Sequence, residues 1–247
     1  MKQKFLLLLL ICLSVCTSAF CQYVSVQSVT GQNPNTVINA HLSGEGVYIS
    51  NGMFNNSAGN ITYPQLGTFS YSGTGFPFHS GLVMTTGNVS VAAGPNNSGS
   101  ASGTVTPSYT DSQLQTVSSG VTSCAALDFD FVAYSDTFAF NYVFGSEEYE
   151  EYVGSSYNDV FAFFLTGLDP VTYVTTTRNV ALIPNTVLPV SINNVNHQSH
   201  TNYYIHNTNG CVQYDGYTTR LTAQASILAC QTYHMHLAIG NVSDDLY

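Results

Sequence analysis

The chain has 247 residues, and its four lysine and arginine residues stand against fourteen aspartate and glutamate residues, for a formal net charge of −10 at pH 7. A surface of this sign repels nucleic-acid phosphate and anionic lipid headgroups, so binding to nucleic acid is not expected. Tyrosine, phenylalanine, glycine, serine, threonine and asparagine are abundant. This composition is typical of an exported, turn-rich, all-β protein.

Residues 1–21 have the pattern of an export signal. Two early lysines precede an apolar run over residues 5–12, and residues 19–21 form a small-x-small cleavage site before Gln22. The apolar run is too short to span a bilayer as a stable anchor, and no later segment is apolar enough to do so. We therefore expect an extracellular or cell-surface protein without membrane insertion in this chain.

Three cysteines remain after the signal: Cys124, Cys211 and Cys230. Cys211 and Cys230 flank two predicted strands, and in an oxidising compartment we expect them to form a disulfide. A closed loop of that length would contribute about 3 kcal/mol in the chain-entropy model. Cys124 is expected to be a buried thiol, with an intermolecular partner as the alternative.

Three strand-like runs between residues 125 and 165 organise the chain. Apolar side chains alternate with polar or smaller ones over 127–131 and 138–144, and a continuous apolar run occupies 160–165. Alternation at period two predicts strands with one buried face. Further strands are predicted at 46–50, 66–70, 82–85, 179–183, 190–192, 217–225 and 233–239. Many short strands separated by glycine, asparagine and proline indicate one all-β domain over residues 22–247, a β-sandwich of the jelly-roll or lectin-like kind with long polar loops.

Three other segments carry weaker signals. Residues 22–39 are predicted to form an edge strand that Pro34 interrupts. The low-complexity stretch 94–103 is predicted to be a mobile surface loop. Residues 111–117 are the best helix candidate, as one short segment.

An acidic cluster is the main candidate for a site, because eight of the fourteen acidic residues lie between Asp128 and Asp159. Two carboxylates 4 Å apart repel each other by about 1 kcal/mol in water and about 4 kcal/mol at a surface-like effective dielectric. Calcium relieves such repulsion and takes carboxylate, amide and carbonyl oxygens as ligands. The candidate calcium ligands are Glu147, Glu148, Asn158, Asp159, Asp128, Asp130 and Asp244. The alternative is a solvated acidic loop whose carboxylates hydrogen-bond to strand ends.

Catalysis and transition-metal binding are two other functions that the polar residues of this chain could serve. A glycosidase needs two carboxyls that face each other, but the adjacent Glu147 and Glu148 would point in opposite directions in an extended chain. No nucleophile elbow, zincin helix or phosphate loop occurs, so no catalysis is expected.

Five histidines could instead ligate zinc or copper, although polar-loop or half-buried strand histidines are the commoner case. They are His197, His200 and His206 in one loop, and His234 and His236 on one strand face.

Tyrosines flank the acidic loop. Tyr149, Tyr152 and Tyr157 are candidate ligand-binding residues, because exposed rings stack on sugar faces while neighbouring amides bond to hydroxyls. The alternative for each ring is packing against strands. Glycans and cell-surface proteins are therefore the expected partners.

Several motifs resemble one known family. The most specific are Phe144-Gly-Ser-Glu-Glu-Tyr149 and Tyr157-Asn-Asp-Val-Phe-Ala-Phe-Phe164, and further matches extend over nearly the whole mature chain. The chain resembles the choice-of-anchor L domain of exported Bacteroidetes surface proteins. It departs from the family pattern at two places: members often carry Asn-Asp where this chain has Ser123-Cys124, and they tend to carry Asp where this chain has Asn241. It also stops at Tyr247, inside the final motif, so a domain without its last strand is expected.

The resemblance implies an extracellular or cell-surface module, often within adhesin-like proteins, and it implies no particular ligand. The expected function is therefore non-enzymatic adhesion or ligand recognition, with calcium as a stabiliser. The alternatives are a structural spacer in a larger adhesin without a ligand of its own, and a carbohydrate-active enzyme.

Overall fold

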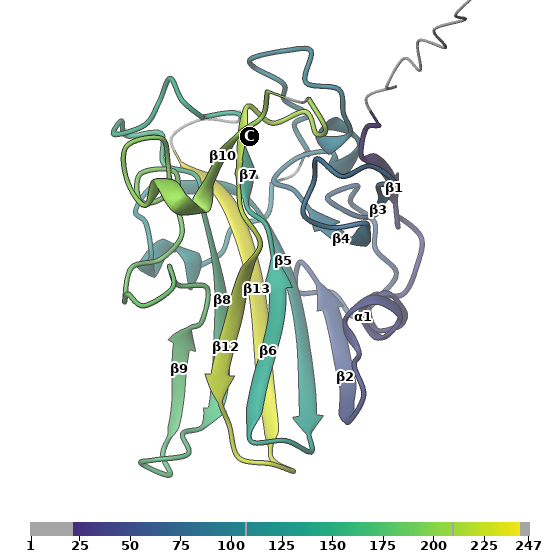
Figure 1. Cartoon of the computed structure of the whole chain (residues 1–247). Helices are drawn as coiled ribbons and strands as arrows, with labels where there is room; N and C mark the ends of the chain where they lie inside the picture. Colours follow the sequence, from purple (N-terminus) through teal and green to yellow (C-terminus); the bar gives the residue numbers. More distant parts are fainter. Residues whose placement is uncertain (1–21, 107, 209, 243–247) are drawn as a thin grey trace, which may run out of the picture.

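The computed structural model describes residues 22–106, 108–208 and 210–242 (Figure 1). The predicted signal peptide and Asp244 lie outside these residues. Within them, the larger sheet contains five antiparallel strands, in the order β2 (Val47–Phe54), β5 (Val121–Ala133), β13 (Thr232–Val242), β8 (Val160–Leu168) and β9 (Thr175–Asn179). The three central strands are the longest of this sheet together with β2, and they contain long runs of buried residues, which shows that much of both faces is covered.

A second layer lies over one face of this sheet. It consists of a two-stranded sheet, β6 (Thr137–Tyr142) with β12 (Leu221–Ser226), and a three-stranded sheet in the order β1 (Ser25–Ser28), β3 (Leu66–Ser70) and β4 (Ser80–Met84). Figure 1 shows β6 and β12 in front of β13 and β8. Aromatic side chains hold the layers together: Phe138 stacks on Phe131 at 4.7 Å, and Phe140 packs on Phe163 at 4.9 Å. The predicted all-β sandwich is confirmed.

A small fourth sheet caps one end of the molecule. Its strands are β10 (Tyr204–His206), β11 (Gly216–Thr218) and β7 (Gly145–Ser146), in that order. Three single 3₁₀ turns occur in the connections, namely η1 (Val89–Ala92), η2 (Leu114–Thr116) and η3 (Thr201–Tyr203). Residues 111–117 thus contribute only a short 3₁₀ turn. The predicted strands at 179–183 and 190–192 are reduced to isolated bridges beyond β9.

The first segment of the domain differs from the prediction. Residues after β1 form an α-helix, α1 (Pro34–Leu42), where an interrupted edge strand was expected. The side chain of Asn33 accepts hydrogen bonds from the backbone N–H groups of Asn35 (3.0 Å) and Thr36 (3.4 Å), and Pro34 occupies the first helical turn. An asparagine cap followed by proline is a helix-start signal, so this proline begins an element that it was expected to break. Among the described residues, no helix combines the length and the apolar character needed to cross a bilayer.

Candidate functional site

β4 and β6 belong to two separate small sheets. In the described part of the chain, β6 pairs only with β12 and β4 pairs only with β3, so each strand has one unpaired edge. Between these two strands lies a cavity of about 480 Å³, which we call the β4–β6 groove. Its volume falls in the range of ligand-binding pockets.

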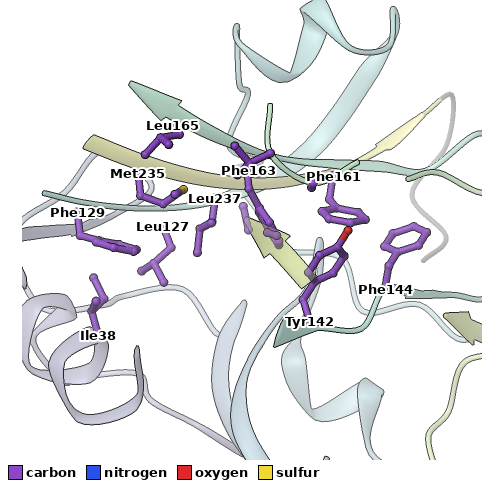
Figure 2. Packing of buried hydrophobic residues seen from close by; sticks show 14 of the residues in the cluster. Ile38, Leu127, Phe129, Tyr142, Phe144, Phe161, Phe163, Leu165, Met235 and Leu237 are labelled. Carbon is purple, nitrogen blue, oxygen red and sulfur yellow. The ribbon is translucent and has the colours of Figure 1, made fainter. Parts of the chain in front are cut away.

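The β4–β6 groove reaches down to the core of the sandwich. Its floor is the inner face of the larger sheet, formed by Leu127, Phe161, Phe163, Leu237 and Ile239. Its walls are residues 80–84 on one side and residues 140–144 on the other. Figure 2 shows Tyr142, Phe161, Phe163 and Leu237 gathered in this region. The site is therefore built from strand residues with fixed positions, and its lining is mainly apolar.

One polar group in the groove has no partner. Tyr142 is buried, and its hydroxyl makes no hydrogen bond to any described residue. Burial raises the pKa of this phenol far above its ordinary value, so the group is neutral. A buried hydroxyl without a partner costs about 1–3 kcal/mol, and such groups are uncommon in folded proteins. The Tyr142 hydroxyl is thus a free donor and acceptor beside an apolar cavity.

The charge around the groove differs from that of the rest of the molecule. Among the described residues, no aspartate or glutamate lines the groove, although the whole chain contains fourteen. The lining includes His41, and the guanidinium of Arg220 lies 4.7 Å from the ring centre of Phe78, another lining residue. Arg220 also donates a hydrogen bond to the carbonyl of Pro77. The groove is thus a neutral site in an acidic protein.

The acidic loop is structured around Glu147, which is 3% exposed. Its Oε1 accepts hydrogen bonds from the Ala101 N–H (3.1 Å) and the Gln213 Nε2 (3.0 Å), and its Oε2 accepts from the Asp215 N–H (3.1 Å). Burial, with a further contribution from the nearby Asp215, outweighs these hydrogen bonds and raises the pKa of Glu147 to about 7. Glu147 therefore joins three segments and is not a solvated carboxylate.

The same contacts explain the low-complexity stretch 94–103. Asn96 donates to Asp215 Oδ1 (2.7 Å), and Gln213 donates to the carbonyl of Ser98 (2.7 Å). Together with the Ala101–Glu147 bond, these contacts attach the stretch to the end of the sandwich. The composition of this stretch predicted a mobile loop. Composition gives no information on its contacts with Gln213, Glu147 and Asp215, which come from other parts of the chain.

The other predicted calcium ligands near the loop belong to a second network. Asp159 is buried and accepts hydrogen bonds from the Ser146 hydroxyl (3.1 Å) and the Val242 N–H (3.2 Å). The Ser146 hydroxyl also accepts from the N–H of Glu148, which is buried as well. Asn158 accepts from the Asn193 N–H (2.9 Å). Glu148 and Asp159 are thus brought near each other, while the Glu147 carboxylate is tied to different segments.

A small cavity of about 10 Å³ adjoins Asp159. Thr86 and Asn241 also line it, and the Thr86 hydroxyl and both polar atoms of the Asn241 side chain have no partner among the described residues. A space of this size holds about one water molecule. Across residues 22–242 as described, no three histidine, cysteine or acidic side chains are grouped so as to hold a metal ion. Calcium binding stays a prediction.

Asp128 and Asp130 lie apart from the acidic loop and face histidines. The antiparallel register places His236 opposite Asp128 and His234 opposite Asp130. His236 Nδ1 lies 2.6 Å from Asp128 Oδ1, and His236 Nε2 lies 2.9 Å from Asp111 Oδ2. His234 Nδ1 lies 2.8 Å from Asp130 Oδ1. These contacts form a buried carboxylate–imidazole–carboxylate bridge, which we call the Asp111–His236–Asp128 bridge.

The charge state of this bridge follows from its geometry. Burial opposes protonation of His236, but its hydrogen bonds to Asp111 and Asp128 outweigh burial and raise its pKa to about 9. Burial alone would raise the pKa of both aspartates, yet hydrogen bonds from the histidines hold them below their ordinary value. Asp111 was not singled out from the sequence. The patterns Asp128-x-Asp130 and His234-x-His236, each on a predicted strand, could have indicated the other contacts.

The three candidate tyrosines separate into two environments. Tyr149 is fully buried, and its hydroxyl donates to the carbonyl of Val195 (2.7 Å), so it anchors the acidic loop. Tyr152 is exposed, and its ring packs edge to face against Tyr157 at 5.2 Å. The structure therefore leaves Tyr152 and Tyr157, and not Tyr149, on the surface of the loop.

The predicted disulfide is not formed, since Cys211 and Cys230 are both free thiols. A disulfide would require the segment between the two cysteines to fold back on itself. Instead β11 and β12 continue in one direction, with Tyr217 opposite Gly145 and Ser226 opposite Thr137. The cysteines consequently lie at opposite ends of this segment. Cys124 is buried, as expected, and burial raises the pKa of its thiol to about 11.

Comparisons with known proteins place the chain in a family. The family model described as the choice-of-anchor L domain matches residues 25–247, which include every strand described above. No curated protein and no solved structure matches the chain. Because the match extends over nearly the entire chain, this protein belongs to the choice-of-anchor L domain family.

Proposed function

We propose that this protein is a non-catalytic recognition module of the cell surface whose ligand binds in the β4–β6 groove. Family membership supports the surface location, since the family is one of surface modules. The observation that carries the proposal is the groove itself, which has about 480 Å³ of space above an apolar floor. Natural ligand sites have this volume and this predominantly apolar lining.

Two alternatives receive less support. A spacer domain without a ligand would gain stability from closing such a groove, because the partly buried apolar side chains of its walls would then lose more contact with water. A glycan site at Tyr152 and Tyr157 has two surface rings in its favour. However, neither Tyr152 nor Tyr157 is among the residues that line the β4–β6 groove, so these rings lie outside the cavity described above.

A neutral apolar dye tests the groove as a ligand site. We expect Nile red to bind the folded protein with increased fluorescence, and Leu82→Lys to weaken that binding at least about tenfold, because a charge in the wall of an apolar site must be desolvated. Leu82 lies on β4 in the lining of the groove and is half-buried. Fluorescence titration gives the affinity of each variant.

The matched control is Gln224→Lys, which adds the same charge to an exposed position of β12. It should bind Nile red as the native protein does. Urea unfolding must show that both variants are folded. Absence of Nile red binding, or equal loss in both variants, would contradict a ligand site in the groove.

A further inference from the structure

The two arginines of the chain differ in their partners. Arg178 forms an ion pair with Asp169 at 2.9 Å. Arg220 forms no ion pair with any described residue, and its one hydrogen bond to them goes to the carbonyl of Pro77. A guanidinium has five N–H donors, so Arg220 keeps donors for a further acceptor. Arg220 is therefore a cation without a described carboxylate partner in a chain whose net charge is −10.

Arg220 lies next to the β4–β6 groove. Its guanidinium is 4.7 Å from the ring centre of Phe78, which lines the groove. The next residue, Leu221, pairs with Tyr142, so Arg220 and Tyr142 lie at the same end of the β6–β12 pair. The Tyr142 hydroxyl is buried and has no partner among the described residues. A cation and a free hydroxyl are thus found at one end of the groove.

These features select a class of ligand. The floor of the groove, with Leu127, Phe161 and Leu237, favours an apolar body that leaves water on binding. The basic side chains at the groove are His41, which lines it, and Arg220, and no described carboxylate lines it. An anionic head therefore meets no like charge in the lining, whereas a cationic head finds no carboxylate there.

We propose that the β4–β6 groove binds an amphipathic carboxylic acid, such as a fatty acid, with its apolar body over the floor and its carboxylate beside Arg220. The head then lies at the end of the groove where the Tyr142 hydroxyl needs an acceptor. This inference names the ligand class of the site and rests on its proposed function. Hydrogen bonds from a guanidinium to a carboxylate are stronger than those between neutral groups.

Two probes of equal chain length and opposite charge test the proposal with the full chain. Decanoate and decylammonium compete with Nile red, and the fluorescence gives the affinity of each. In 0.15 M salt the Debye length is about 8 Å, so distant charges are largely screened. We expect decanoate to bind at least about fivefold more tightly than decylammonium, although the net charge of the chain alone favours the cation.

The arginine variants locate the source of this preference. Arg220→Gln should reduce the ratio of decanoate to decylammonium affinity about fivefold, since Arg220 is exposed and exposed ion pairs are modest in strength. Arg178→Gln removes the same charge from β9, outside the lining of the groove, and should leave the ratio unchanged. Urea unfolding must show that both variants are folded. A purely structural effect of Arg220→Gln would weaken both probes equally and leave the ratio unchanged.

Several results would overturn the proposal. Decylammonium binding as tightly as decanoate, or equal effects of the two arginine variants, would overturn the carboxylate head, and if Nile red still bound, the groove itself would stand as a ligand site. No binding of Nile red or of either probe would overturn the ligand class together with the proposed function. Self-association of the native chain in sedimentation, abolished by Leu82→Lys, would show a second copy as the occupant of the groove and overturn the small ligand.

Discussion

His236→Leu is expected to lower the free energy of unfolding by about 3–5 kcal/mol, because it leaves two buried carboxylates without their cation. His236 is 6% exposed, and its two ring nitrogens lie 2.6 Å from Asp128 and 2.9 Å from Asp111. Asp111 also accepts a hydrogen bond from the Leu114 N–H (2.8 Å), so the bridge fastens η2 to the larger sheet. Urea unfolding at pH 6 measures the loss.

His234→Leu is the matched control on the same face of β13. His234 also contacts Asp128 (3.4 Å), but its side chain is 39% exposed, so its loss should cost less than about 1 kcal/mol. Equal destabilisation by the two variants would contradict a special role for the buried bridge.

The contribution of the Asp111–His236–Asp128 bridge to stability should depend on pH. The pKa of His236 is raised from 6.5 to about 9, so its contribution is complete below pH 6.5 and is lost as the pH rises through 9. Asp111 and Asp128 have lowered pKa values, and their contribution is present above pH 3.8 and is lost on further acidification. The native protein should therefore lose stability between pH 6.5 and 9, and His236→Leu should remove most of that loss.

Glu147→Ala is expected to lower the free energy of unfolding by about 3 kcal/mol, because three N–H donors lose their acceptor. The donors are Ala101 N, Gln213 Nε2 and Asp215 N. Glu147→Gln keeps an acceptor oxygen and should cost about 1 kcal/mol. Urea unfolding at pH 5, below the raised pKa of about 7, compares the two variants while Glu147 is still neutral in the folded state.

Glu151→Ala is the control, since Glu151 is exposed on the same loop. It should change stability by less than about 0.5 kcal/mol. The pKa of Glu147 is raised from 4.5 to about 7, so ionisation of this buried group disfavours the folded state, and stability falls as the pH rises through 7. Glu147→Gln should abolish that part of the pH dependence. Similar losses in Glu147→Ala and Glu151→Ala would contradict the anchoring role of Glu147.

Local patterns predicted the strands of the core well. The alternation around Phe129 and Phe140 and the apolar run from Val160 identified β5, β6 and β8, because burial of one strand face is a property of each strand alone. The start of α1 was also readable from Asn33-Pro34, but the chain around it was rich in β-formers and the helix was missed.

Properties that depend on pairing could not be predicted from the sequence. Cys211 and Cys230 could form a disulfide only if β11 and β12 folded back on each other. In the structure the two strands continue in one direction, and the spacing of the cysteines in the sequence does not distinguish the two paths. The acidic residues that were predicted as one cluster lie in two places. Glu147 bonds to Gln213 and Asp128 bonds to His236, because the fold brings together residues that are far apart in the sequence. The β4–β6 groove lies between two strands that do not pair with each other in the described part of the chain. Alternation of apolar and polar residues within a strand does not indicate which strands lie beside it.

The claim that joins fold and function is that the β4–β6 groove is a ligand site. Amide hydrogen exchange, followed by mass spectrometry with and without Nile red, tests it most directly. Nile red should slow exchange in both Ser80–Met84 and Thr137–Tyr142, because both strands contribute residues to the walls of the groove. Protection confined to the acidic loop around Tyr152, with β4 and β6 unchanged, would contradict the account.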